Sequence, residues 1–87
     1  MATEEQAIRA SNSPAFSRHL NAMEQHEEFA GYGTLLTQND DYAVAIYVVG
    51  EAAQLSKKFL ETLPEKVPLT PDVAVPVIIH NVGSLVL

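Results

Sequence analysis

The sequence predicts an all-α fold, a small bundle of three or four helices that pairs with a second copy. Three observations lead to this prediction: helix-starting sequences recur along the chain, apolar residues in its middle follow a heptad spacing, and hydrophobic residues make up 47% of the 87 positions. A chain of this length has room for one small domain, residues 1–87, which buries roughly two-thirds of its unfolded surface. Because such a core cannot hide all the aliphatic side chains, we expect a homodimer to cover the excess.

The amino-terminal residues predict a short first helix. Thr3 and Gln6 have the spacing of a capping box, in which the side chain of each residue bonds the backbone amide of the other. Two amides that lack a partner inside the helix are satisfied in this way. We expect this helix to run to about Ala10 and to stop at Ser11-Asn12.

A second, amphipathic helix is predicted from Pro14 to about Ala30. Ser13 suits its N-cap and Pro14 its first position, where a missing amide hydrogen costs nothing. The apolar residues that recur at helical spacing in this stretch are Phe16, Leu20, Met23 and Ala30. Gly31-Tyr32-Gly33 would end the helix, because glycine readily adopts the left-handed conformation found at helix C-termini.

The stretch from Thr34 to Leu63 allows two interpretations, and the first is one long helix capped by Asn39-Asp40-Asp41. Its seam has a heptad spacing and consists of Tyr42, Ala45, Val49, Ala52, Ser56, Phe59 and Leu63. The charges also fit a helix, because aspartates lie at its positive end and Lys57-Lys58 in its last turns.

In the second interpretation, residues 34–49 form a β-hairpin and a shorter helix begins near Glu51. The β-branched and aromatic run Ile46–Val49 supports a strand here. The fold would then be α+β, and a dimer could continue its small sheet edge to edge. We favour the long helix, since capping, charge and periodicity agree over several turns.

The carboxy-terminal segment begins with another helix-start sequence, Thr70-Pro71-Asp72. From Val73 to Leu87 the residues are nearly all aliphatic, so periodicity does not separate a buried helix from a buried strand. Pro76 would remove one backbone hydrogen bond and bend a helix. The segment is shorter than a transmembrane helix requires, so we expect a core or dimer element and no membrane contact.

Charge narrows the classes of function. Eleven carboxylates against five basic side chains give a net charge of −6, which repels phosphate backbones and argues against direct nucleic-acid binding. The same charge suits a basic protein surface as partner. No cysteine is present, and the acidic residues after Met1 do not resemble a targeting signal, so we expect a cytoplasmic protein.

Two groups of residues are candidates for binding. His19 and His26 are weak candidates for a metal site, because seven residues of a straight helix separate them by about 10 Å, too far for a single ion. Glu24, Glu27 and Glu28 read as a solvated helix face that would dock a basic partner, with Tyr32 as an aromatic anchor.

These observations predict a non-enzymatic protein-binding module, an adaptor, inhibitor or immunity-type protein that acts as an acidic homodimer without a cofactor. His80 and Ser84 could approach each other on a helix, but no carboxylate lies near them in sequence to orient the histidine as a catalytic base. The alternative is a protein that binds a small ligand or a metal in a pocket at the subunit interface. That pocket would be lined by His19, His26, Tyr42, Tyr47 and His80.

Overall fold

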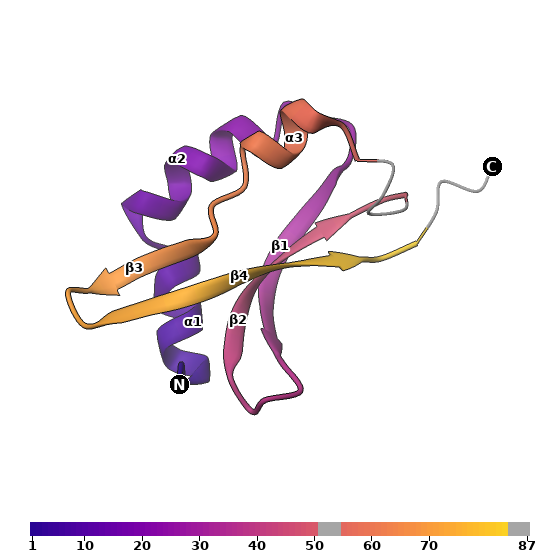
Figure 1. Cartoon of the computed structure of the whole chain (residues 1–87). Helices are drawn as coiled ribbons and strands as arrows, with labels where there is room; N and C mark the ends of the chain where they lie inside the picture. Colours follow the sequence, from indigo (N-terminus) through magenta and orange to yellow (C-terminus); the bar gives the residue numbers. More distant parts are fainter. Residues whose placement is uncertain (51–54, 84–87) are drawn as a thin grey trace.

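The computed structural model describes residues 1–50 and 55–83 and shows an α+β protein, so the predicted all-α bundle is wrong (Figure 1). The described residues form one four-stranded mixed sheet with its strands in the order β1-β2-β4-β3. In chain order, the elements are α1 (Glu4–Ser11), α2 (Pro14–Met23), β1 (Phe29–Leu36), β2 (Tyr42–Val48), α3 (Lys57–Glu61), β3 (Lys66–Thr70) and β4 (Val73–Asn81).

The first two helices begin where the sequence predicts. In α1 the amide of Gln6 donates to Thr3 Oγ1 at 3.2 Å, and the amide of Thr3 donates to Gln6 Oε1 at 2.9 Å, which completes the capping box. In α2 the hydroxyl of Ser13 accepts from the amide of Phe16 at 3.3 Å. The second helix ends at Met23 and not near Ala30, because the chain turns after Met23 and enters the sheet.

The stretch predicted as a long helix, Thr34 to Leu63, contains most of a β-hairpin, as the second interpretation proposed, and the short helix α3. β1 pairs with β2 in antiparallel register from Phe29 to Leu36, so the hairpin begins earlier than Thr34. The glycines at 31 and 33 lie inside β1 and do not end a helix. Gly31 has a φ of 146° beside a register shift between Phe29 and Gly31, a backbone conformation that favours glycine.

The carboxy-terminal stretch is a strand. β4 pairs with β3 in antiparallel register as far as Pro76, and from Val77 it pairs with β2 in parallel register. Proline suits the position where the partner changes, since it donates no backbone hydrogen bond to a ladder. The predicted helix start at 70–72 is a tight turn in which Thr70 Oγ1 accepts from the amide of Val73 at 3.0 Å. Leu87 and the three residues before it lie outside the described residues, as does the helix start predicted near Glu51.

The helices lie against one face of the sheet, and the core fills the space between the two layers. In Figure 1 β4 crosses in front of α1, which contacts all four strands. Alternate residues of β2 (Val44, Ile46 and Val48) face the helices and are fully buried. The other large, fully buried side chains of the core are Phe16, Met23, Phe59, Val67 and Val75.

Candidate interaction surface

The outer edge of β1 is an open edge of the sheet. Among the described residues β1 has one neighbouring strand, β2, and none of its eight residues carries a charge. An edge strand presents unpaired backbone groups that can pair with another chain. The sequence from Phe29 to Leu36 therefore forms a long, uncharged template for a further strand.

The hydrogen-bond pattern shows which residues of β1 face this edge. The amide of Thr37 donates to the carbonyl of Asp41 at 2.9 Å, which makes these two residues a hydrogen-bonded pair at the end of the hairpin. Hydrogen-bonded and non-hydrogen-bonded pairs alternate in an antiparallel ladder. The three non-hydrogen-bonded pairs that follow are Leu36–Tyr42, Thr34–Val44 and Tyr32–Ile46. The backbone groups of Tyr32, Thr34 and Leu36 thus point away from β2.

The other strand of the hairpin confirms this assignment of the non-hydrogen-bonded pairs. The amide of Tyr42 donates to the carbonyl of Ala2 at 3.0 Å, so it points away from β1. A residue of a non-hydrogen-bonded pair behaves in this way. Its partner in the register, Leu36, must point its own backbone groups in the opposite direction, toward the free edge.

Tyr32, which the sequence predicts as a partner-binding residue, lies on this edge strand. Its ring packs against Phe16 of α2 with the ring centres 5.5 Å apart and the planes tilted by 55°. Tyr32 remains 40% exposed, and Leu36 on the same face of β1 is 48% exposed. The edge therefore combines open backbone groups with two exposed apolar side chains, and the sequence analysis missed the second of these.

The three predicted docking carboxylates do not share a helix face. Glu24, Glu27 and Glu28 follow the end of α2 and lie in the turns that lead into β1. Glu24 and Glu27 are exposed. Glu28 Oε2 accepts hydrogen bonds from the hydroxyl of Ser56 at 2.7 Å and from its amide at 3.0 Å, and these bonds lower the pKa of Glu28. Glu28 therefore holds the start of α3, and only the other two carboxylates face solvent freely.

The opposite edge of the sheet, β3, has a different character. It spans five residues and carries Lys66 and Pro68. A charged side chain and a proline on an edge strand are features that hinder pairing with another strand. β3, which covers β4 only as far as Pro76, is thus a less favourable template for a further strand than β1.

The two candidate metal ligands, His19 and His26, lie in different parts of the fold. His19 lies on α2, where its Nδ1 is 3.1 Å from the carbonyl oxygen of Thr62, whereas His26 lies beyond the end of that helix with its ring against Phe59. Their predicted placement on one straight helix is therefore wrong. Within the described part of the chain, no three His, Cys, Asp or Glu residues lie close enough together to hold a metal ion.

The residues of the predicted ligand pocket are dispersed. Tyr47 and His80 pack edge to face on the sheet face away from the helices, with ring centres 5.8 Å apart. Tyr42 lies beside Glu4 instead, and the negative charge of that carboxylate, together with a hydrogen bond to it, raises the pKa of the phenol. The two remaining histidines, His19 and His26, contact α3 and the residue that follows it.

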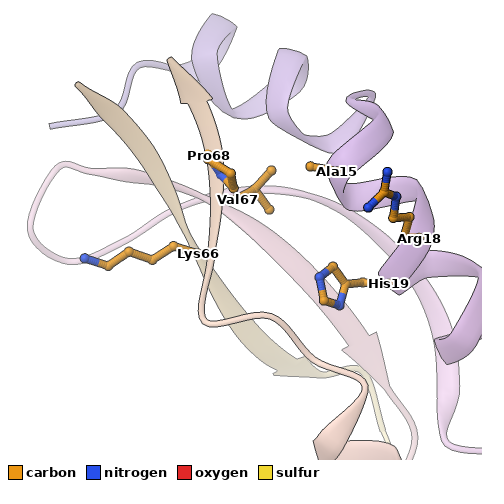
Figure 2. A pocket seen from close by; sticks show the side chains of 6 residues that line it. All are labelled: Ala15, Arg18, His19, Lys66, Val67 and Pro68. Carbon is orange, nitrogen blue, oxygen red and sulfur yellow. The ribbon is translucent and has the colours of Figure 1, made fainter. Parts of the chain in front are cut away.

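A shallow cavity of about 200 Å³ lies between α2 and β3 (Figure 2). Arg18, His19 and Lys66 line it together with the apolar residues Ala15, Val67 and Pro68. Figure 2 shows the Lys66 side chain extending away from Arg18 and His19. The three basic groups therefore do not converge on one point inside the cavity.

Comparisons of the chain with protein-family models, with curated proteins and with solved structures find no match. No helix in residues 1–50 and 55–83 is both long and apolar enough to cross a lipid bilayer.

Proposed function

We propose that this chain is a non-enzymatic protein-binding module that works as an acidic homodimer and binds through the free edge of β1. The observation that carries the proposal is the uncharged, eight-residue edge strand with Tyr32 and Leu36 exposed on it. Tyrosine is enriched among the residues that dominate binding energy at protein interfaces.

The contrast between the two edges supports binding at β1. Soluble proteins guard exposed edges with charges, prolines or short strands, because an open edge invites pairing with other chains. Lys66 and Pro68 guard β3 in this way, whereas β1 has no such residue along its length. β1 lacks these protective features although β3 has them. This difference supports pairing of β1 with a further strand.

The charges around β1 support a protein partner over a nucleic acid. Glu24 and Glu27 lie exposed before the strand, and Asp40 lies exposed in the turn after it. A basic protein partner should contact these carboxylates beside the edge, while the second copy covers the edge itself. We assign the contact with the basic partner to Glu24 and Glu27, because Glu28 is bonded to Ser56, and the contact between the two copies to Tyr32.

The placement of the reactive side chains supports binding over catalysis. A nucleophile needs a base within hydrogen-bond reach and a third group that orients the base. His80 packs against Tyr47, His19 faces the carbonyl of Thr62, and His26 packs against Phe59. Ser84, the residue considered beside His80, lies outside the described residues.

Sedimentation velocity over a range of protein concentrations tests the proposal. We expect a monomer–dimer equilibrium in which the dimer dominates at high concentration. A chain that stays monomeric at every concentration would overturn the homodimer. The same samples, mixed with duplex DNA and with RNA, should show no co-sedimentation at physiological salt, since the acidic surface repels phosphates.

A further inference from the structure

The backbone groups on the free edge of β1 are self-complementary. Tyr32, Thr34 and Leu36 each offer one outward amide and one outward carbonyl, with the spacing of two residues that an antiparallel partner requires. A second copy turned by 180° offers the same three residues in reverse order. This edge can therefore pair with itself.

The bulge in β1 limits where the two strands can pair. Its register shifts between Phe29 and Gly31, so the regular part of the strand runs from Gly31 to Leu36. A two-fold axis must lie near the middle of that part if all three outward residues are to find partners. With the axis at Thr34, Tyr32 lies opposite the partner's Leu36, and Thr34 lies opposite its own copy.

This register also covers the exposed side chains. Tyr32 and Leu36 lie on the same face of β1, and both keep more than a third of their surface exposed. Side chains directly opposite each other across an antiparallel pair have their Cβ atoms about 4.5–5.5 Å apart. Tyr32 of each copy would thus pack on the partner's Leu36, which gives two equivalent apolar contacts about one axis.

Pairing of β1 with its own copy gives a closed arrangement. If β1 of one copy paired with β3 of another, each copy would keep a free edge and the chains would form open filaments. Pro68 lacks a backbone donor, and Lys66 brings a charge to that strand. Pairing of β1 with β1 uses the same strand on both copies and stops at two.

We infer that two copies pair their β1 strands in antiparallel register about a two-fold axis at Thr34, with Tyr32 of each copy packed on the partner's Leu36. The two four-stranded sheets become one continuous sheet. This inference rests on the proposed homodimer and adds the register of the two strands and the position of the two-fold axis.

Single cysteines test the register, because the chain has no cysteine of its own. Residues opposite each other in a hydrogen-bonded antiparallel pair have Cα atoms about 5.5 Å apart, within the range that a disulfide bridges. Thr34→Cys should therefore oxidise to a covalent dimer. Ala30→Cys is the matched control on the same strand, and it should stay monomeric under oxidation because its two copies lie about 26 Å apart in this register.

A mixture of two variants sharpens the result. Tyr32→Cys alone and Leu36→Cys alone should not cross-link, since each residue lies about 13 Å from its own copy along the strand. Mixed together, they should form the covalent heterodimer. Cross-linking of Ala30→Cys in place of Thr34→Cys would show a different register and overturn the inference.

A proline variant tests the pairing of the β1 strands without disulfide cross-linking. Thr34→Pro removes an amide that faces solvent in the single copy, so the fold should persist by circular dichroism while the dimer is lost. If Thr34→Pro is folded and still dimeric, the β1 pairing is wrong although the homodimer stands. If the unmodified chain is monomeric at all concentrations, both proposals fail.

Discussion

The ring of Tyr47 lies directly on the backbone of Gly33 in the neighbouring strand. A Cβ atom added at Gly33 would stand 2.9 Å from Tyr47 Oη and 3.3 Å from the nearest ring carbon. Glycine at position 33 therefore allows the Tyr47 ring to approach the backbone closely, on the face of the sheet that the helices do not cover. The absence of a side chain at this position allows the tyrosine to cover the hairpin.

Replacing Gly33 by alanine should lower the free energy of unfolding by about 1 kcal/mol, because the new methyl group overlaps the tyrosine hydroxyl and the ring must shift. Tyr47→Phe removes the closest atom, so the Gly33→Ala substitution should cost less in the Tyr47→Phe background than in the original chain. Urea denaturation of the two single variants and the double variant measures this coupling. If Gly33→Ala lowers the free energy of unfolding equally in both backgrounds, the Tyr47 hydroxyl does not restrict the side chain at position 33.

Local signals in the sequence predicted the starts of the first two helices correctly. The bonds of Thr3 with Gln6, and of Ser13 with Phe16, involve residues three positions apart, so the sequence alone contains all that decides them. The same reasoning failed at Thr70, where the side chain bonds forward to the amide of Val73 but closes a turn between two strands. A serine or threonine capping bond is common to helix starts and turns.

The long helix failed for a different reason. β2 is buried on both faces: Val44 and Ile46 face the helices, while Ala43 and Ala45 on the other face are also fully buried. Because neither face of β2 carries charged residues, the sequence shows no alternation of apolar and polar residues that would indicate a strand. The apolar residues of this stretch also happen to match a heptad spacing, which indicated a helix. The β-branched and aromatic composition of residues 46–49, with Gly50 after them, favoured the hairpin.

The proposed interaction surface was predictable only in part. Tyr32 was named from the sequence as an aromatic anchor, and it lies on the free edge. Thr34 and Leu36 were missed, because a residue faces a free edge only through the order of strands in the sheet. That order depends on the pairing of β2 with β4, whose residues Val44 and Val77 are far apart in sequence. No local pattern contains this information.

The bond between Glu28 and Ser56 predicts a dependence on acid. Ser56 lowers the pKa of Glu28, mainly through its hydroxyl and then through its amide. A carboxyl with a lowered pKa in the folded state contributes stability above its unfolded pKa, and this contribution disappears as the pH falls through the lowered value. Ser56→Ala should raise the pKa of Glu28 toward its ordinary range, as followed by NMR titration of the side-chain carboxyl. A pKa that stays low in Ser56→Ala would contradict the assignment.

Tyr42 and Glu4 make the corresponding prediction at high pH. The charge of Glu4, and then its hydrogen bond, raises the pKa of Tyr42. An acid whose pKa is raised on folding stabilises the folded state below its unfolded pKa, and this contribution is lost as the pH rises through the raised value. Glu4→Gln should lower the pKa of Tyr42, seen as earlier tyrosinate absorbance in an ultraviolet titration. Glu4→Gln leaves the capping box of Thr3 and Gln6 unchanged. As a control, α1 should therefore keep its helicity in this variant.

The dimer itself should become tighter in salt. With the two-fold axis at Thr34, the turn that carries Asp40 follows the paired part of one β1 and lies near the start of the partner's β1, which the exposed Glu24 and Glu27 precede. Like charges brought together in this way weaken association. Asp40 has a φ of 58°, a left-handed conformation that asparagine also tolerates, so Asp40→Asn removes the charge and keeps the turn. Two relieved contacts of about 0.3 kcal/mol each should tighten the dimer roughly threefold at low salt. At high salt the variant and the original chain should converge, because screening removes the same repulsion. Sedimentation equilibrium at two ionic strengths measures both effects, and a dimer that weakens as salt is added would place attractive charges, and hence a different surface, between the two copies.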